Sequence, residues 1–202
     1  MRLDEIEDRF GDAVELTWRS FLLRPFPEER TLDRFRRYTE SWRRPAAMEP
    51  QATFRVWEGD ADPPSHSVPS AVAGKLAEGF GDDASRRYHR ALLAAYFTEN
   101  RTISDPDVLA AVAEETGLAG DEFRAGYDER FEELREDVFA DHAAAAEAGI
   151  AAVPTVVVDG QFPIPGAQDL DLYERIVTRR RGLDDRGFDD NGLNDKALDD
   201  QG

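Results

Sequence analysis

The sequence predicts an α/β fold in which a large all-helical insertion separates two smaller parts. Three observations lead to this prediction. Residues 14–21 alternate apolar and polar side chains, which is the period of a strand. Residues 67–149 carry helical periodicity almost throughout. Residues 155–158 form a β-branched run, and Asp159-Gly160 follows it as a signal for a two-residue hairpin turn.

The N-terminal part is expected to hold a helix and then a strand. Leu3, Ile6 and Phe10 recur at helical spacing, with acidic residues between them. No capping residue precedes this helix, which is typical of a helix cut partway along. We expect residues 14–21 to form a strand in the same sheet as residues 156–158.

The middle of the chain is expected to be helical apart from a proline-bearing loop over residues 46–65. Apolar stripes, Asp or Ser start signals and prolines in first turns set the boundaries. The predicted helices cover residues 28–42 and 67–80, a stretch that begins at Asp82 or Asp83, residues 105–117, a short helix from Asp121, and a long helix that ends at Gly149.

These patterns divide the chain into four segments. Residues 1–27 and 149–182 are the two parts of one α/β domain, and the second part ends in a helix whose last turn is Arg179-Arg180-Arg181. Residues 28–148 are the helical insertion with its connecting helix. Residues 183–202 are rich in Asp, Gly and Asn, so we expect a disordered acidic tail.

The charge balance restricts the possible partners. The 202 residues carry 43 acidic and 25 basic side chains, a net charge of -18, which argues against nucleic acid and anionic membranes. Lysine occurs only at Lys75 and Lys196, and an acid-rich, lysine-poor composition favours a halophilic protein from a high-salt cytoplasm over an ordinary acidic protein. No apolar run could span a bilayer, and the acidic N-terminus does not resemble a secretory signal, so we expect a cytoplasmic location.

Thiol chemistry has no residue to support it within this sequence. There is no cysteine, and therefore no thiolate for disulfide exchange, nucleophilic catalysis or metal binding. His66, His89 and His142 show no metal-ligand spacing and lie near no motif-like serine, so ordinary surface or core roles are expected for them. We therefore predict no catalytic residue, no metal site and no cofactor.

The stretch Gly149-Ile150-Ala151-Ala152-Val153-Pro154-Thr155, followed by a hairpin and Pro165-Gly166, resembles the second half of a thioredoxin fold. More closely, it resembles the DsbA family, in particular the FrnE-like branch of disulfide oxidoreductases and isomerases. Residues 95–106, which include Ala-Tyr-Phe and Ile-Ser-Asp-Pro, resemble the helical insertion of the FrnE-like proteins. The resemblance implies a thioredoxin-like fold, a cis bond before Pro154, and a Val153 backbone that holds extended substrate. Val153 and Pro154 are thus the predicted substrate-binding residues.

The sequence also departs from the family's pattern. Matched residue by residue, the chain begins inside the family's first helix, so its first strand and Cys-x-x-Cys turn are missing. We expect an N-terminally truncated thioredoxin-like fold that cannot do redox chemistry as given and whose thiols would lie upstream of Met1. One alternative is a non-redox module that binds peptides through the Pro154 loop. Another is the related group of kappa-class glutathione transferases and hydroxychromene-carboxylate isomerases, whose serine near the first strand is also absent. The expected partner is an extended peptide or a small thiol substrate.

Overall fold

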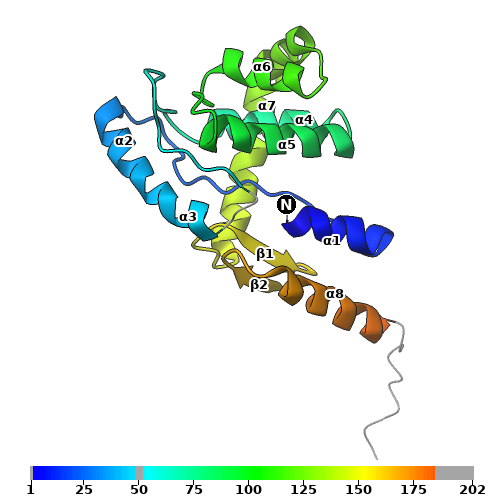
Figure 1. Cartoon of the computed structure of the whole chain (residues 1–202). Coiled ribbons are helices and arrows are strands. Elements are labelled where there is room, and N and C mark those ends of the chain that lie inside the picture. The colour runs from blue at the N-terminus through cyan, green and yellow to red at the C-terminus, as the bar shows by residue number, and fades with distance from the viewer. Residues whose placement is uncertain (1, 49–51, 185–202) are drawn as a thin grey trace, which may run out of the picture. The chain divides into compact units, whose positions relative to one another are not determined.

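The computed structural model describes residues 2–48 and 52–184, and the chain divides into two compact units. One unit, here called the hairpin unit, comprises residues 1–17 and 152–202, and the other, the helical unit, comprises residues 18–151. Figure 1 shows the elements of both units. Residues 185–202, where the sequence predicts a disordered tail, lie outside the described ranges.

The hairpin unit contains two helices and a two-stranded sheet. Its elements are α1 (Arg2–Phe10), a 3₁₀ turn (Gly11–Ala13), β1 (Thr155–Val158), β2 (Phe162–Pro165) and α8 (Leu170–Asp184). The strands are antiparallel, and Val156 lies opposite Ile164. Helix α1 packs on α8, where it buries Ile6. The expected first helix and the hairpin are therefore confirmed.

Two side-chain contacts hold α1 to the segment at and before α8. Arg2 donates to the backbone carbonyl of Gln168 across 2.6 Å, and Arg9 forms an ion pair with Glu174. Tyr173 is buried on α8. Ile6 and Tyr173 are the buried apolar side chains in the described part of the hairpin unit, so α1 and α8 are joined with little apolar burial.

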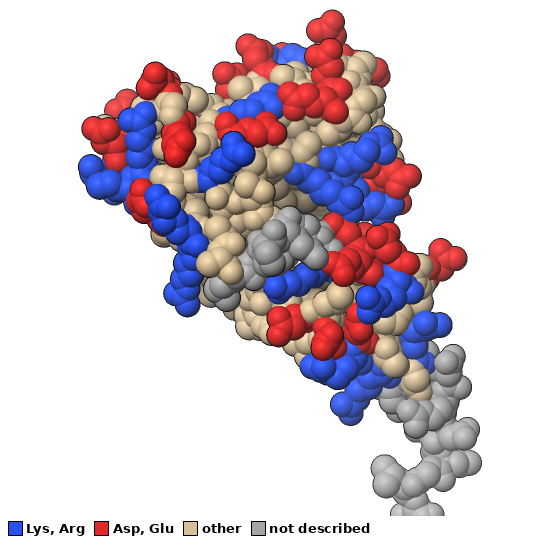
Figure 2. All heavy atoms as spheres, in the orientation of Figure 1, with Lys and Arg blue, Asp and Glu red and all other residues tan. Residues whose placement is uncertain are grey.

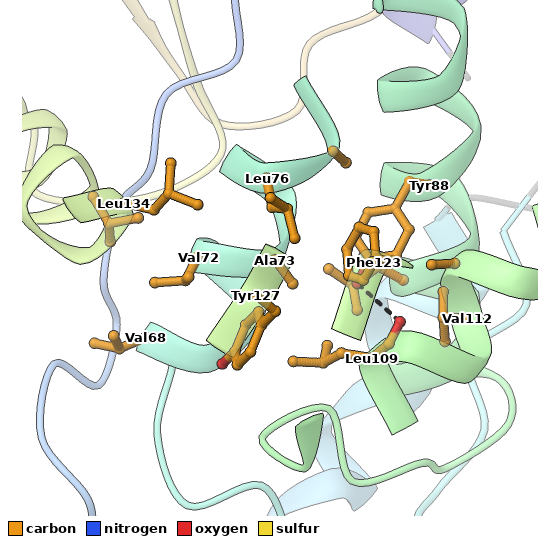
Figure 3. Packing of buried hydrophobic residues seen from close by; sticks show 14 of the residues in the cluster. Val68, Val72, Ala73, Leu76, Tyr88, Leu109, Val112, Phe123, Tyr127 and Leu134 are labelled. Carbon is orange, nitrogen blue, oxygen red and sulfur yellow. Dashed lines mark hydrogen bonds between the residues drawn. The ribbon is translucent and has the colours of Figure 1, made fainter. Parts of the chain in front are cut away.

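The helical unit is built around α7 (Gly120–Glu147) and three shorter helices that pack with it and with one another, α4 (Val68–Glu78), α5 (Asp82–Phe97) and α6 (Pro106–Glu115). Aromatic and branched side chains from all four meet in one buried cluster (Figure 3). Tyr88 lies inside it and donates its hydroxyl to the Leu109 carbonyl at 3.3 Å, which satisfies the polar group that burial would otherwise leave unpaired.

A second, aromatic cluster lies under α2 (Leu32–Thr39), a 3₁₀ turn (Glu40–Trp42) and α3 (Arg43–Met48). Phe35, Trp42 and Trp57 are buried there, with edge-to-face ring contacts between Phe35 and each of the two tryptophans. The sequence predicted one helix that ends near Trp42. The helical path instead continues to Met48, because Pro45 falls in the first turn of α3, where no helical N–H is required.

Start signals were mostly predicted correctly. Asp105 caps α6 by accepting the Asp107 N–H at 2.9 Å. Ser67 precedes α4 as expected, but its hydroxyl makes no cap bond and accepts the Arg24 N–H instead. The two helices predicted between Asp121 and Gly149 are a single 28-residue helix. Packing against α4 and α6 stabilises it and outweighs the roughly 1 kcal/mol helix penalty of Gly126.

The strand expected at residues 14–21 is wrong, as is its place beside residues 156–158. This segment is extended but forms no ladder in the described part of the chain. Its backbone binds side chains of α7 instead: the Ser20 N–H donates to Asp141, and the Leu22 N–H donates to Nδ1 of His142. Any extended segment that packs one side against a helix alternates in the same way, so the period alone did not identify a strand.

Within the described ranges, none of the helices combines the length and the apolar composition needed to cross a bilayer.

Candidate functional site

The predicted site lies just after α7 ends. Gly149 has a φ of +74°, a left-handed conformation that glycine adopts without a Cβ clash. Its N–H donates to the Ala146 carbonyl at 3.0 Å, and the Ile150 N–H donates to the Ala145 carbonyl at 2.9 Å. These two bonds form a Schellman motif, which stops the helix sharply and turns the chain toward β1.

Val153 and Pro154 form the loop before β1, and the peptide bond between them is cis, as the resemblance implied. The loop is fixed on both sides. The Thr155 hydroxyl donates to the Ala152 carbonyl at 2.7 Å, and the Pro154 carbonyl accepts the Gly166 N–H at 2.8 Å. Val153 is 42% exposed, and its own backbone N–H and C=O have no hydrogen-bond partner among the described residues. This is the backbone position at which the family resemblance predicts that extended substrate binds.

The strand register determines where the next backbone groups point. Gly166 and Pro154 are a bonded pair, and bonded pairs alternate along an antiparallel ladder, so Val156 and Val158 also bond toward β2. Thr155 and Val157 therefore direct their N–H and C=O groups away from β2. With Val153 they make a row of outward backbone groups along one edge, here called the open edge of β1.

The opposite edge of the hairpin is different. By the same register, the positions of β2 whose nitrogens point away from β1 are 163 and 165, and both are proline. A proline nitrogen carries no hydrogen to donate, so this edge cannot support a full ladder. Only one edge of the hairpin is thus chemically able to accept another strand.

The two faces of the hairpin also differ. Val156, Val158 and Ile164 share one face and are half-buried, whereas Val157, on the other face, is 41% exposed. Arg180 of α8 lies over the Phe162 ring at 4.8 Å and bonds Asp159 at 2.8 Å, which places α8 along the half-buried face. The open edge therefore adjoins an apolar face that carries Val153, Val157 and the two β2 prolines.

The described residues contain no cluster of three or more His, Cys, Asp or Glu side chains that could hold a metal ion. The three histidines serve local packing in the helical unit. Ser65 Oγ lies 2.8 Å from Nδ1 of His66, the His89 ring lies 4.4 Å from that of Trp18, and His142 accepts the Leu22 N–H. Burial lowers the pKa of both His66 and His89.

The sequence did not predict one ionic cluster. Asp141 of α7 is buried and accepts hydrogen bonds from Lys75 at 2.9 Å, Arg19 at 3.0 Å and the Ser20 N–H at 3.1 Å. Burial alone would raise the pKa of Asp141, but these donors outweigh it, and the pKa lies below its ordinary value. Because the donors come from residues 66 and more positions earlier in the chain, no local spacing could have revealed them.

Known proteins are similar to this chain along most of its length. The pattern of the DSBA-like thioredoxin domain matches residues 1–178. The chain is 30% identical over 173 residues to the uncharacterized protein YwbO of Bacillus subtilis (strain 168), covering 83% of each chain. It is 27% identical over 150 residues to the ClpXP adapter protein SpxH of the same organism, covering 71% of this chain and 50% of that one.

The fold is also shared with a solved structure. The cytosolic disulfide reductase DsbM from Pseudomonas aeruginosa, determined with GSH, superposes with a TM-score of 0.71 at 17% identity. The match covers 90% of this chain and 91% of that one, so the similarity extends through the helical unit as well as the hairpin unit.

Proposed function

The chain belongs to the DSBA-like thioredoxin domain family of thiol-disulfide oxidoreductases, and from this premise we propose that its own residues bind extended polypeptide at Val153 and the open edge of β1. Its 202 residues include no cysteine. The part of the family's activity that these residues can perform is therefore the docking of substrate, and any thiol-disulfide exchange requires thiols from elsewhere.

One observation carries this proposal: Val153, Thr155 and Val157 direct backbone donors and acceptors outward, while proline occupies the matching positions of β2. Adding a strand to such an edge gives affinity through main-chain hydrogen bonds, whatever the peptide's sequence. The fixed loop around Pro154 means that these groups are ordered before the peptide arrives, which lowers the entropic cost of binding.

The test uses the full chain and an eight-residue peptide of alternating valine and threonine. Three forms are compared by fluorescence anisotropy: unmodified, N-methylated at alternate residues, and N-methylated at consecutive residues. Alternate methylation leaves one peptide edge intact, so we expect it to bind like the unmodified peptide. Consecutive methylation blocks both edges and removes two or more hydrogen bonds of about 1 kcal/mol each, which predicts at least about a tenfold loss.

Equal affinity for the alternate and consecutive forms would contradict strand addition, because side-chain recognition alone is insensitive to which peptide edge is blocked. A direct assay of insulin reduction checks the other half of the proposal: the chain alone should show no activity above buffer. The relative SpxH is named as an adapter protein, and adapter proteins act by binding a partner. That role is compatible with a docking function that needs no sulfur.

Glutathione is a second candidate ligand, supported by the structural similarity to a disulfide reductase determined with GSH. Glutathione is a small thiol with peptide bonds of its own, so the Val153 backbone offers it the same donor and acceptor. Titration calorimetry with S-methylglutathione would detect this binding without any redox step. Competition between S-methylglutathione and the valine–threonine peptide would show that they share the open edge.

We also propose a cytoplasmic location, a place in the FrnE-like branch with its isomerases, and adaptation to high salt. The cytoplasmic location is supported by a structural neighbour whose name describes it as cytosolic. The net charge of -18 supports the last, because added salt screens self-repulsion in the folded state. The free energy of unfolding should then rise between 0.1 and about 2 M KCl; a fall over that range would contradict halophilic adaptation.

A further inference from the structure

The two most exposed large apolar side chains among the described residues are Leu23, at 68%, and Phe26, at 69%, both in the helical unit. They are not on a loose loop. The backbone of Arg24, between them, exchanges hydrogen bonds with Ser67 at 3.2 and 2.8 Å, and the Glu28 N–H donates to the Ser65 carbonyl at 3.2 Å. Pro25 and Pro27 further restrict the segment. The apolar side chains are therefore presented to solvent on a pinned backbone.

This segment is joined to α2 by an arginine stacked on an aromatic ring. The Arg24 guanidinium lies 5.5 Å from the ring centre of Tyr38, and the Arg30 guanidinium lies 5.5 Å from the same ring. Tyr38 remains 47% exposed. Aromatic and arginine side chains held in this way lose little conformational entropy on binding, and both types are enriched at energetically important contacts.

The solvent face of α2 and α3 continues this surface with arginines. Arg34, Arg37 and Arg44 recur there at spacings of three and seven, opposite the buried Phe35 and Trp42. All three are exposed, and no ion pair or hydrogen bond joins their side chains to any other residue in ranges 2–48 and 52–184. In Figure 2 basic side chains follow the edge of the molecule formed by α2 and α3.

Other arginines of the same helices show that this lack of partners is specific to one face. Arg36 pairs with Asp33 and Asp60 and also donates to the Gly59 carbonyl, and Arg43 pairs with Glu40 at 2.7 Å. The chain has 43 acidic residues. Even so, the side chains of Arg34, Arg37 and Arg44 pair with no carboxylate among the described residues, so their charge remains available to a partner.

We propose that this surface binds a short segment of a partner protein in which Asp or Glu residues stand beside large apolar residues. The binding surface, here called the arginine–aromatic face, consists of Leu23, Phe26, Tyr38, Arg34, Arg37 and Arg44. Guanidinium groups bind carboxylates through paired hydrogen bonds, and the exposed leucine and aromatic rings bury against the partner's apolar side chains. The site is separate from the open edge of β1 and does not depend on the function proposed there.

Length and screening favour a short acidic segment. The arginines span ten residues of helical chain, or about 15 Å, which four or five residues of an extended partner would cover. At physiological ionic strength the screening length is about 8 Å, so the three arginines outweigh the distant acidic surface.

The experiment measures binding of fluorescent 12-residue peptides to the full chain by anisotropy at 0.15 M salt. The test peptide repeats Asp-Phe-Glu-Leu; a second peptide replaces Phe and Leu with Ser, and a third replaces Asp and Glu with Asn and Gln. We expect the test peptide to bind at least about tenfold more tightly than either of the others, because each lacks one of the two contributions. A 15-nucleotide oligothymidylate serves as the nucleic-acid probe.

Two sets of variants locate the site. Arg34→Gln, Arg37→Gln and Arg44→Gln together should weaken binding about tenfold or more. Arg124→Gln, Arg130→Gln and Arg135→Gln on α7 change the net charge equally and should leave binding within about twofold. Leu23→Ser with Phe26→Ser should also weaken it, whereas the half-exposed Leu93→Ser should not. Equal losses in both arginine triples, equal binding of all three peptides, or tighter binding of the oligonucleotide would each overturn the proposal.

Discussion

The helical unit and the hairpin unit differ most in how much apolar surface they bury. Among the described residues, every fully buried apolar side chain except Ile6 and Tyr173 belongs to residues 18–151. Both units expose some apolar side chains, such as Leu23 and Phe26 in the helical unit and Val153 and Phe162 in the hairpin unit, so the contrast lies in burial alone. Burial is the main favourable contribution to stability, so the helical unit is expected to supply most of the folding free energy.

The hairpin unit shows how a binding edge and stability compete. Strands that present outward backbone groups cannot also satisfy those groups internally, so a binding edge is kept at the expense of stability. The open edge of β1 is such a place. Substitutions in the core of the helical unit should therefore affect unfolding most, whereas substitutions at the open edge of β1 should affect peptide binding there more than unfolding.

The largest effect on stability is expected for Phe123→Ala. Phe123 is buried against Tyr88, with ring centres 5.0 Å apart, and truncation leaves a cavity in the main core. We expect a loss of about 3–5 kcal/mol in the free energy of unfolding, measured by urea denaturation. The matched change Phe162→Ala, at a ring 52% exposed in the hairpin unit, should cost less than about 1 kcal/mol. Similar losses at both sites would remove the contrast between the units.

Asp141→Asn should have the next largest effect, a loss of about 2–4 kcal/mol, because it leaves the nearly buried Lys75 without its closest carboxylate. Asp128→Asn is the control on the same helix. Asp128 is exposed and forms an ion pair with Arg124 alone among the described residues, so its substitution should cost less than about 1 kcal/mol.

The effect of Asp141 should depend on pH in a defined direction. Its folded-state pKa is lowered, so the charged form stabilises the fold at every pH above the unfolded pKa of about 3.9. The difference between wild type and Asp141→Asn should be complete above about pH 5 and should shrink as the pH falls below about 4. A difference that grows on acidification would contradict the hydrogen-bonded carboxylate.

Sequence reasoning found local signals well and distant partners poorly. Asp105, Gly149 and the Val156–Ile164 hairpin were predictable because each depends on residues a few positions away. Two features were not predictable. One is that α7 is a single helix, and the other is that Asp141 and His142 bind the backbone of residues 14–22. Both depend on packing between segments far apart in sequence, which periodicity does not encode.

The cis loop at Val153 and Pro154 was predicted, and its role in substrate binding stays a prediction. A resemblance, not a pattern of charges, pointed to Val153 and Pro154, and the structure places them at an exposed loop with unused backbone groups. Which residues of β1 point outward required the register, because a shift of one residue would have exchanged Val156 for Val157.

A smaller effect is expected at the junction between the units. Gly149→Ala forces a side chain into a left-handed conformation, although nothing lies within 4 Å of the new Cβ, and should cost about 1 kcal/mol. Gly74→Ala is the matched control, because Gly74 also has open space around it but lies inside α4 with ordinary helical geometry. It should stabilise the protein by about 0.5–1 kcal/mol. If the two variants change the free energy of unfolding with opposite signs, measured by thermal or urea unfolding, the left-handed conformation of Gly149 is confirmed.

The smallest effect on stability, but a distinct effect on association, is expected for Pro163→Val with Pro165→Val. The exchange restores two outward N–H donors on β2 and changes the free energy of unfolding by less than about 1 kcal/mol. With both hairpin edges able to pair, the variant should form larger species at high concentration, which sedimentation velocity would detect. Unchanged sedimentation would show that the prolines do not protect that edge.

Amide hydrogen exchange along β1, followed by NMR with and without the valine–threonine peptide, tests the open edge most directly. In the free protein the amides of Thr155 and Val157 should exchange faster than those of Val156 and Val158, because only the latter pair is hydrogen-bonded to β2. Saturating peptide should slow Thr155 and Val157 and leave the other two nearly unchanged. Uniform exchange along β1, or no response of Thr155 and Val157 when the peptide binds, would contradict strand addition at this edge.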